Sequence, residues 1–261
     1  MNRSRCFFLV LYMFFAFGFG GGCARLVIPD QPEQQVAPAE VQLARLAEIN
    51  TQIRPFKGIG ELRVYSREGS FSFRGAWLGV PERRFRVETV GVAGQPGVRL
   101  ICDGDACHFL YEENACFRKI SSRRQNLSQL AGIDMDVADL VLLLGGGIPV
   151  VDHDAAWIEN ENDPGGPVIK LHRRFYGEVE TIRFTGDMSR VREVAVYGFR
   201  NLKYRAEIVS TRLVNGRRIP DRLLVENEDA AMQLVVERVW YDTEYGPDAF
   251  IPRVPEERLC D

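Results

Sequence analysis

Histidine is scarce in this chain of 261 residues, which contains three: His108, His153 and His172. None of them stands four residues from a second ligand on a predicted helix, as a zinc site would require, and no Gly-x-Ser-x-Gly elbow is present. Asp152-His153-Asp154 follows Pro149 closely and is predicted to be a solvated loop. The sequence therefore predicts no catalytic residue, no metal site and no cofactor, with a hydrolase as a less favoured alternative.

Blocks of basic residues interleaved with aromatics are also missing, which argues against a nucleic-acid partner. The chain has 33 basic and 36 acidic residues, for a net charge of −3. The glycine triplet Gly145-Gly146-Gly147 follows a predicted helix, whereas a phosphate-binding loop precedes the helix whose N-terminus it uses. We interpret the triplet as a helix stop.

Long apolar runs are limited to residues 6–22, a stretch of 17 residues that follows Arg3 and Arg5. The run is slightly shorter than the roughly 20 residues that a membrane-spanning helix needs, so residues 1–22 are predicted to be a signal peptide. Its end, Gly20-Gly21-Gly22-Cys23, resembles the lipobox of bacterial lipoproteins. That resemblance implies that Cys23 is acylated and becomes the first residue; an uncleaved N-terminal anchor is the alternative.

Residues 23–38 contain three prolines and several glutamines and are predicted to be a flexible tether behind the lipidated cysteine. Ala24 resembles an outer-membrane sorting signal of lipoproteins, which implies lipid anchoring at the periplasmic face of the outer membrane. Residues 39–261 are predicted to form a single domain. It opens with a helix from Ala39 to Ile53, where apolar residues recur at threes and fours before Pro55.

Alternation of apolar and polar residues dominates the rest of the chain. Four short alternating runs lie between Ser70 and Tyr111, with turn signals such as Asp103-Gly104 between them, and predict an antiparallel meander. Single strands are predicted before and after this meander, and six more between residues 168 and 242. Glu178 and Glu180 alternate with apolar residues in one of these runs and are predicted to face solvent.

Helical spacing returns briefly after Asp134 and Asp136, either of which can cap a helix whose apolar face includes Leu140 and Leu144. The predicted fold class is therefore mainly β (α+β). We expect a large curved antiparallel sheet, or half-barrel, of about 11–12 strands with helices covering its concave face.

Four cysteines follow Cys23, an even number in a chain predicted to be exported to an oxidising compartment. If residues 103–106 form a tight turn, Cys102 and Cys107 lie opposite each other on one hairpin, which leaves Cys116 for Cys260. Their spacings fit no zinc pattern. The alternative is that some of the four are buried thiols that act as small apolar residues.

Several short motifs resemble the LolA/LolB superfamily of bacterial lipoprotein carriers and receptors. They are Phe-Lys-Gly-Ile-Gly-Glu-Leu-Arg-Val at 56–64, Phe-Arg-Gly-Ala-Trp-Leu at 73–78, Leu-Leu-Gly-Gly-Gly-Ile-Pro at 143–149 and Asp-Ala-Phe-Ile-Pro at 248–252. An acylated N-terminus is more similar to the membrane-anchored receptor than to the soluble carrier. The resemblance implies a hydrophobic cavity that takes acyl chains of lipoproteins or lipids, and a periplasmic carrier protein as a further partner.

The predicted cavity is lined by apolar residues of the meander and of the covering helix. They are Phe71, Phe73, Trp77, Phe85, Val87, Leu100, Phe109, Leu140 and Leu144. By similarity to the family, Val92 or Ala93 in the loop 91–97 is expected to aid insertion of cargo into the membrane. The predicted function is a non-enzymatic, membrane-anchored lipoprotein that delivers acyl chains to the outer membrane. The alternative is an envelope scaffold lipoprotein whose helices fill the cavity.

Overall fold

The computed structural model describes residues 33–67, 69–81, 83–89, 97–113, 116–122, 126–159, 165–199, 201–253 and 258–260. These residues belong to one compact unit, Glu33–Asp261. The predicted signal peptide, Cys23, Val92 and Ala93 lie outside the described residues. Among the described residues, no helix is both long and apolar enough to cross a bilayer.

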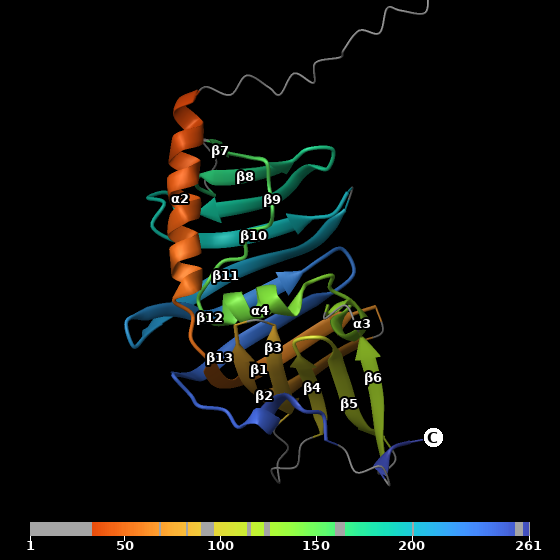
Figure 1. The fold of residues 1–261 in the computed structure, drawn as a ribbon. Helices are drawn as coiled ribbons and strands as arrows, with labels where there is room; N and C mark the ends of the chain where they lie inside the picture. Colours follow the sequence, from red (N-terminus) through yellow and green to blue (C-terminus); the bar gives the residue numbers. More distant parts are fainter. Residues whose placement is uncertain are drawn as a thin grey trace, which may run out of the picture. The chain divides into compact units, whose positions relative to one another are not determined.

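Thirteen described strands form one antiparallel sheet (Figure 1). The N-terminal half consists of β1 (Phe56–Ser66), β2 (Gly69–Val80), β3 (Arg84–Thr89), β4 (Val98–Asp103), β5 (Cys107–Glu113) and β6 (Cys116–Ser122). The C-terminal half consists of β7 (Ala155–Glu159), β8 (Val168–Arg173), β9 (Gly177–Phe184), β10 (Val191–Tyr197), β11 (Leu202–Val214), β12 (Arg217–Glu226) and β13 (Ala231–Tyr241). The predicted fold class is confirmed, with β7 as a strand that the sequence analysis missed.

The two halves are meanders that join where β1 pairs with β13. The spatial order runs from β6 to β1, then from β13 to β7, and within the described residues β6 and β7 do not pair. The sheet is therefore open. The register of β1 on β13 shifts between Ile59 and Gly60, which leaves Glu237 as a β-bulge.

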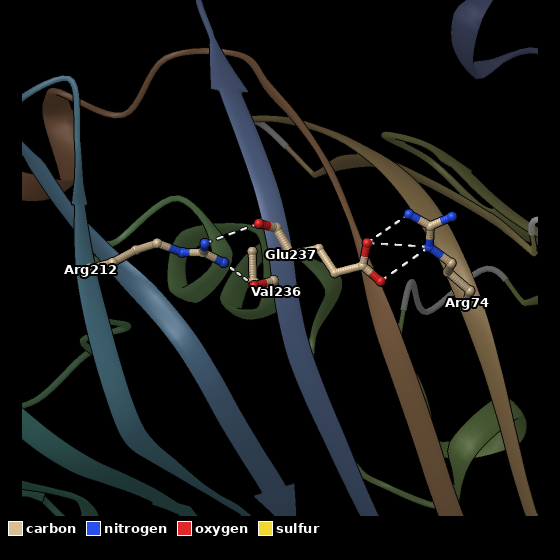
Figure 2. A network of polar contacts seen from close by, with 4 residues as sticks. All are labelled: Arg74, Arg212, Val236 and Glu237. Atoms are coloured by element: carbon tan, nitrogen blue, oxygen red, sulfur yellow. Dashed lines mark hydrogen bonds and ion pairs between the residues drawn. The ribbon is translucent and has the colours of Figure 1, made fainter.

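Arginine side chains brace this seam on the outer face (Figure 2). Arg74 on β2 donates to both carboxylate oxygens of Glu237, with nitrogen–oxygen distances of 2.7 to 3.2 Å. Arg212 on β11 donates to the backbone oxygens of Val236 and Glu237. Since a bulge interrupts the ladder, we infer that Arg212 supplies donors to carbonyl groups at the point where the ladder is irregular.

Helices cover the inner face of the sheet. They are α2 (Glu33–Thr51), α3 (Ser128–Ala131) and α4 (Val137–Leu144). Figure 1 shows α2 lying across strands of the C-terminal half and α4 across the middle of the sheet. Leu43 and Leu46 of α2 and Leu140 of α4 belong to one buried cluster with inward-facing side chains of the strands.

The first helix begins earlier than predicted. It runs through Pro38 from Glu33, so residues 33–38 are helical and not part of an extended tether. The prolines and glutamines before Ala39 favoured a tether, but the helix continues through Pro38, its sixth residue, although a proline at this position removes one i→i−4 hydrogen bond.

A second, smaller apolar cluster lies on the outer face of the N-terminal half. Its buried members are Ile101, Leu110, Phe117 and Phe250. Phe250 comes from the 3₁₀ helix η1 (Pro247–Phe250), and Arg86 fixes this helix by donating to the backbone oxygen of Ala249 at 2.7 Å. The N-terminal half of the sheet is thus covered on both faces.

Candidate functional site

An apolar pocket lies on the inner face of the N-terminal half, beneath α3 and α4. All nine residues predicted to line a cavity contribute to its wall: Phe71, Phe73, Trp77, Phe85, Val87, Leu100, Phe109, Leu140 and Leu144. The wall also includes Leu62 and Val64 of β1 and Met232 of β13, which were not predicted from the sequence. Their alternation marks an inward face, but pairing of β1 with β13 is what brings them to the pocket.

Strand register brings these side chains together. Trp77 is opposite Val87, Val87 is opposite Leu100, and Leu100 is opposite Phe109, so each strand presents an apolar residue at the same level of the sheet. Helix α4 forms the roof of the pocket. Leu140 and Leu144 are one turn apart on this helix, so both side chains point to the same side.

The N-terminus of this roof is fixed by Asp136. Its side chain accepts from the backbone N–H of Ala138 at 2.9 Å, and its carboxylate pairs with Arg83. The capping residue is one of the two predicted from the sequence.

Glycines in β1 and β2 make room for aromatic side chains of the neighbouring strand. A Cβ on Gly58 would lie 2.4 Å from the indole of the buried Trp77, and a Cβ on Gly79 would lie 2.4 Å from the ring of Phe56. Each glycine is the cross-strand partner of the aromatic residue that covers it. The glycines of Phe-Lys-Gly-Ile-Gly therefore lie where a neighbouring side chain or backbone approaches β1 closely.

The pocket is narrow in this conformation. Its volume is about 90 Å³, whereas pockets for small-molecule ligands commonly measure roughly 300 to 1,000 Å³. Phe71 is 50% exposed and stacks on Phe73 with ring centroids 6.0 Å apart. These two rings therefore stand between solvent and the buried end of the pocket at Trp77, and a guest larger than a few carbon atoms requires them to move.

A second pocket, of about 280 Å³, lies on the other side of α4 against α2. Its wall includes Arg45, Arg190, Arg217 and Arg218 together with apolar residues, and none of the described residues that line it is acidic. It shares no wall residue with the apolar pocket. The nine residues predicted to line a cavity all belong to the apolar pocket.

A buried polar cluster links α4 to the C-terminal half of the sheet. The Tyr204 hydroxyl donates to Asp139 at 2.9 Å, and the backbone N–H of Val151 donates to Glu180 at 2.8 Å. Burial raises the pKa of Asp139 to about 6 and that of Glu180 to about 8. Burial also raises the pKa of Tyr204 well above its usual value.

The prediction that Glu180 faces solvent is wrong. Its side chain is fully buried on the same face of β9 as Ile182 and Phe184. The shared parity with these two apolar residues is the signal that was available in the sequence. Glu178, in contrast, is partly exposed, and its carboxylate oxygen Oε2 lies 3.5 Å from Nζ of Lys170.

The loop Asp152-His153-Asp154 makes hydrogen bonds that support the local fold. The Asp154 carboxylate accepts from the backbone N–H of Arg174 at 2.6 Å, and the His153 ring nitrogen Nδ1 lies 2.9 Å from the Val151 oxygen. Within the described ranges, no three His, Cys, Asp or Glu side chains come together in a way that would hold a metal ion.

Two disulfides join the four cysteines that follow Cys23. Cys102 pairs with Cys107 across the β4–β5 hairpin, and Cys116 on β6 pairs with Cys260. These are the pairs that the sequence analysis predicts. Cys102 and Cys107 are both buried beside the apolar pocket.

Comparison with solved structures identifies the fold. A domain from Vibrio parahaemolyticus, provisionally assigned to outer membrane lipoprotein sorting, matches with a TM-score of 0.58 at 10% identity, covering 83% of this chain and 97% of that one. A LolA superfamily protein from Nitrosomonas europaea matches with a TM-score of 0.53 at 15% identity, covering 82% and 97%. This chain has a LolA-like fold.

A third match shows that the fold is shared beyond proteins described as lipoprotein-sorting. A DUF1329 family protein from Desulfovibrio piger has a TM-score of 0.51 at 10% identity, covering 83% of this chain and 97% of that one. No protein-family model and no curated protein sequence matches the chain. At these identities the LolA-like similarity concerns the fold, and function has to be argued from the pocket.

Proposed function

We propose that this protein is a non-enzymatic carrier that binds acyl chains of lipoproteins or lipids in the apolar pocket beneath α4. The observation that carries the proposal is the convergence of nine apolar side chains on one pocket within a LolA-like fold. An apolar wall favours a hydrocarbon guest by about 0.8 kcal/mol per buried methylene, and such binding needs no covalent step. The proposed function therefore involves no catalysed reaction.

Entry of a chain requires opening at the mouth. Phe71 and Phe73 are stacked on each other at the mouth, and the four-residue helix α3 lies at the same end. Side-chain rotation of partly exposed aromatics is fast compared with movement of a packed helix. We therefore expect the two phenylalanines to move first and the roof helix α4 to adjust afterwards.

Binding of the fluorescent fatty acid cis-parinaric acid to the delipidated protein tests this function. The double variant Phe71→Gln/Phe73→Gln removes apolar surface from the mouth and should weaken binding at least tenfold, or about 1.4 kcal/mol. Leu213→Gln is the matched control, because Leu213 is 64% exposed on β11 and outside the pocket wall. Equal loss of affinity in both variants would contradict a pocket-specific site.

Anchoring is the second part of the proposal. The lipobox-like end of the apolar run supports acylation of Cys23, and with it a place at the periplasmic face of the outer membrane. A periplasmic carrier protein would then deliver the cargo, and Val92 or Ala93 would assist its insertion. Replacing Cys23 with Ala should release the protein from the membrane fraction and change its apparent mass; an unchanged distribution and mass would refute acylation at this residue.

The small volume of the pocket favours a second candidate function. Because the pocket measures only about 90 Å³, the helices nearly fill the space above the sheet. This is expected of an envelope scaffold lipoprotein that carries no cargo. The two functions differ in one measurement. Saturable binding of cis-parinaric acid supports the carrier, whereas its absence from the delipidated, folded protein supports the scaffold.

A further inference from the structure

Chain reversals at one edge of the sheet form a surface that the proposed function does not use. Because the strands are antiparallel, the β1–β2, β8–β9, β10–β11 and β12–β13 turns all lie at the same edge. The registers show this: Tyr65 pairs with Ala231, Arg205 with Glu226, and Val196 with Glu180. The mouth of the apolar pocket at Phe71 is close to the β1–β2 turn and thus to this edge.

Three exposed aromatic residues gather on two neighbouring turns of this edge. Phe175 is 76% exposed and Tyr176 is 53% exposed in the β8–β9 turn, and Phe199 is 63% exposed after β10. The rings of Tyr176 and Phe199 meet edge to face with centroids 6.3 Å apart. We call these three residues the aromatic tip. Phe199 lies two residues after the end of β10 at Tyr197.

The backbone holds Phe175 in a conformation that the residue rarely adopts. Its φ is +69°, in the left-handed region that favours glycine or asparagine. The fold thus displays a large apolar ring at a turn position where a small polar residue would be less strained and better solvated. Observed strain at an exposed site supports a functional reason for the residue.

Arginines flank the aromatic tip. The Arg173 guanidinium lies 5.3 Å from the Tyr176 ring centre and that of Arg174 lies 5.0 Å from the Phe175 ring centre. A carboxylate, that of Asp154, accepts a hydrogen bond from the backbone N–H of Arg174. The tip therefore combines exposed aromatic surface with two cationic side chains in a chain whose net charge is −3.

We propose that the aromatic tip, with Arg173 and Arg174, docks on the headgroup layer of an anionic lipid bilayer. Aromatic rings are enriched where proteins meet this layer, and arginine is attracted to anionic headgroups. Exposed apolar residues on an ordinary protein surface are usually scattered singly. In the aromatic tip, by contrast, exposed rings contact each other and are flanked by charged side chains. Docking by this edge would bring the pocket mouth to the membrane side. The proposal stands whether or not the pocket binds an acyl chain.

Co-sedimentation with lipid vesicles tests the proposal. The protein used starts at Glu33, because residues 33–261 form a compact unit with the whole described core and both disulfides. We expect it to bind vesicles of phosphatidylglycerol and phosphatidylethanolamine at least tenfold more tightly than vesicles of phosphatidylcholine. The variant Phe175→Asn/Tyr176→Ser/Phe199→Ser should lose at least tenfold in affinity for the anionic vesicles, since asparagine tolerates the positive φ.

Two further variants separate the contributions. Leu213→Ser is the matched control, because this exposed residue lies at the opposite edge, next to the β11–β12 turn, and should leave binding unchanged. Arg173→Gln/Arg174→Gln should weaken binding and reduce its dependence on salt. Unchanged vesicle binding by the aromatic variant would overturn the proposal, as would equal binding to both vesicle types. A parent protein that does not bind vesicles but self-associates through the aromatic tip would also overturn the proposal. It would show that the tip is a protein interface instead.

Discussion

At the scale of single residues, the buried carboxyl group of Glu180 makes stability depend on pH. Burial raises the pKa of Glu180 to about 8 and that of Asp139 to about 6, above their ordinary values of 4.5 and 3.8. Both groups therefore hold protons in the folded state that the unfolded state has already released. The free energy of unfolding should fall as the pH rises, from about 4.5 to about 8 through Glu180 and from about 3.8 to about 6 through Asp139, by up to about 1.4 kcal/mol per pH unit for each group.

Glu180→Gln should remove much of this dependence. Glutamine resembles the protonated carboxyl group and can still accept from the backbone N–H of Val151, so the variant should match the parent at pH 5 and be more stable at pH 8. Urea unfolding at pH 5, 6.5 and 8 measures the difference. Glu178→Gln, two residues away and partly exposed, is the control. A parent protein whose stability rises towards pH 8 would contradict the expected direction.

Residues of the pocket were more predictable than the residues of this polar cluster. Trp77, Val87 and Leu100 follow a strict alternation in a local meander, and each is placed by its sequence neighbours alone. Glu180 also alternates, but its charge suggested the outer face although Ile182 and Phe184 share its parity. A carboxyl group buried in its neutral form looks the same in sequence as one in water.

At the scale of elements, the contact between α2 and the end of α4 depends on one asparagine. The Asn50 side chain donates to the backbone oxygen of Ile148 at 2.7 Å and accepts from the N–H of the same residue at 2.9 Å. The glycine triplet allows this approach, because a Cβ on Gly147 would lie 2.5 Å from the Asn50 side chain and one on Gly146 would lie 2.3 Å from the Arg218 oxygen.

Asn50→Ala should therefore destabilise the fold by roughly 2–4 kcal/mol, since both polar groups of the buried Ile148 backbone lose their partner. Thr51→Ala is the matched control on the same helix, where an exposed hydroxyl binds the Glu48 oxygen. The midpoint of urea unfolding measures both variants. A loss in Asn50→Ala no larger than that in Thr51→Ala would show that apolar packing alone holds α2 in place.

Elements with strong periodicity were predicted well, and short ones were not. The helix Val137–Leu144 has its cap, its apolar face and its glycine stop in the sequence. Strand β7 has five residues after a charged loop and forms by pairing with β8, so its own sequence carries little signal. The glycine triplet was correctly interpreted as a stop. It also lets α2 and β12 each come close to the backbone of the triplet, and this second role depends on tertiary packing.

At the scale of the whole molecule, the sheet is assembled by contacts that no local pattern reveals. β1 pairs with β13, and each half is a meander whose neighbours are adjacent in sequence. The alternation predicts the two meanders but not their junction. The Glu237 bulge and the arginines that brace it are likewise products of this junction (Figure 2).

The far end of the N-terminal half is held by a long-range disulfide. Cys116 and Cys260 are 144 residues apart in sequence, whereas Cys102 and Cys107 are five apart. Around this bond, Leu259 bridges to Phe117 in parallel and the Cys260 N–H donates to the Phe117 oxygen at 3.0 Å. Residues 258–260 therefore cover part of β6, the last strand at this side of the sheet, where unpaired backbone groups would otherwise be open to another chain.

The two disulfides should differ in their effect on stability. In the chain-entropy model, closing the longer loop stabilises the fold by about 5 kcal/mol and closing the shorter one by about 2 kcal/mol. Cys116→Ser/Cys260→Ser should therefore lower the free energy of unfolding more than Cys102→Ser/Cys107→Ser does, as measured by urea unfolding. It should also increase self-association, because β6 loses its cover. The reverse order would mean that packing of the buried Cys102 and Cys107 beside the pocket contributes more than loop closure does.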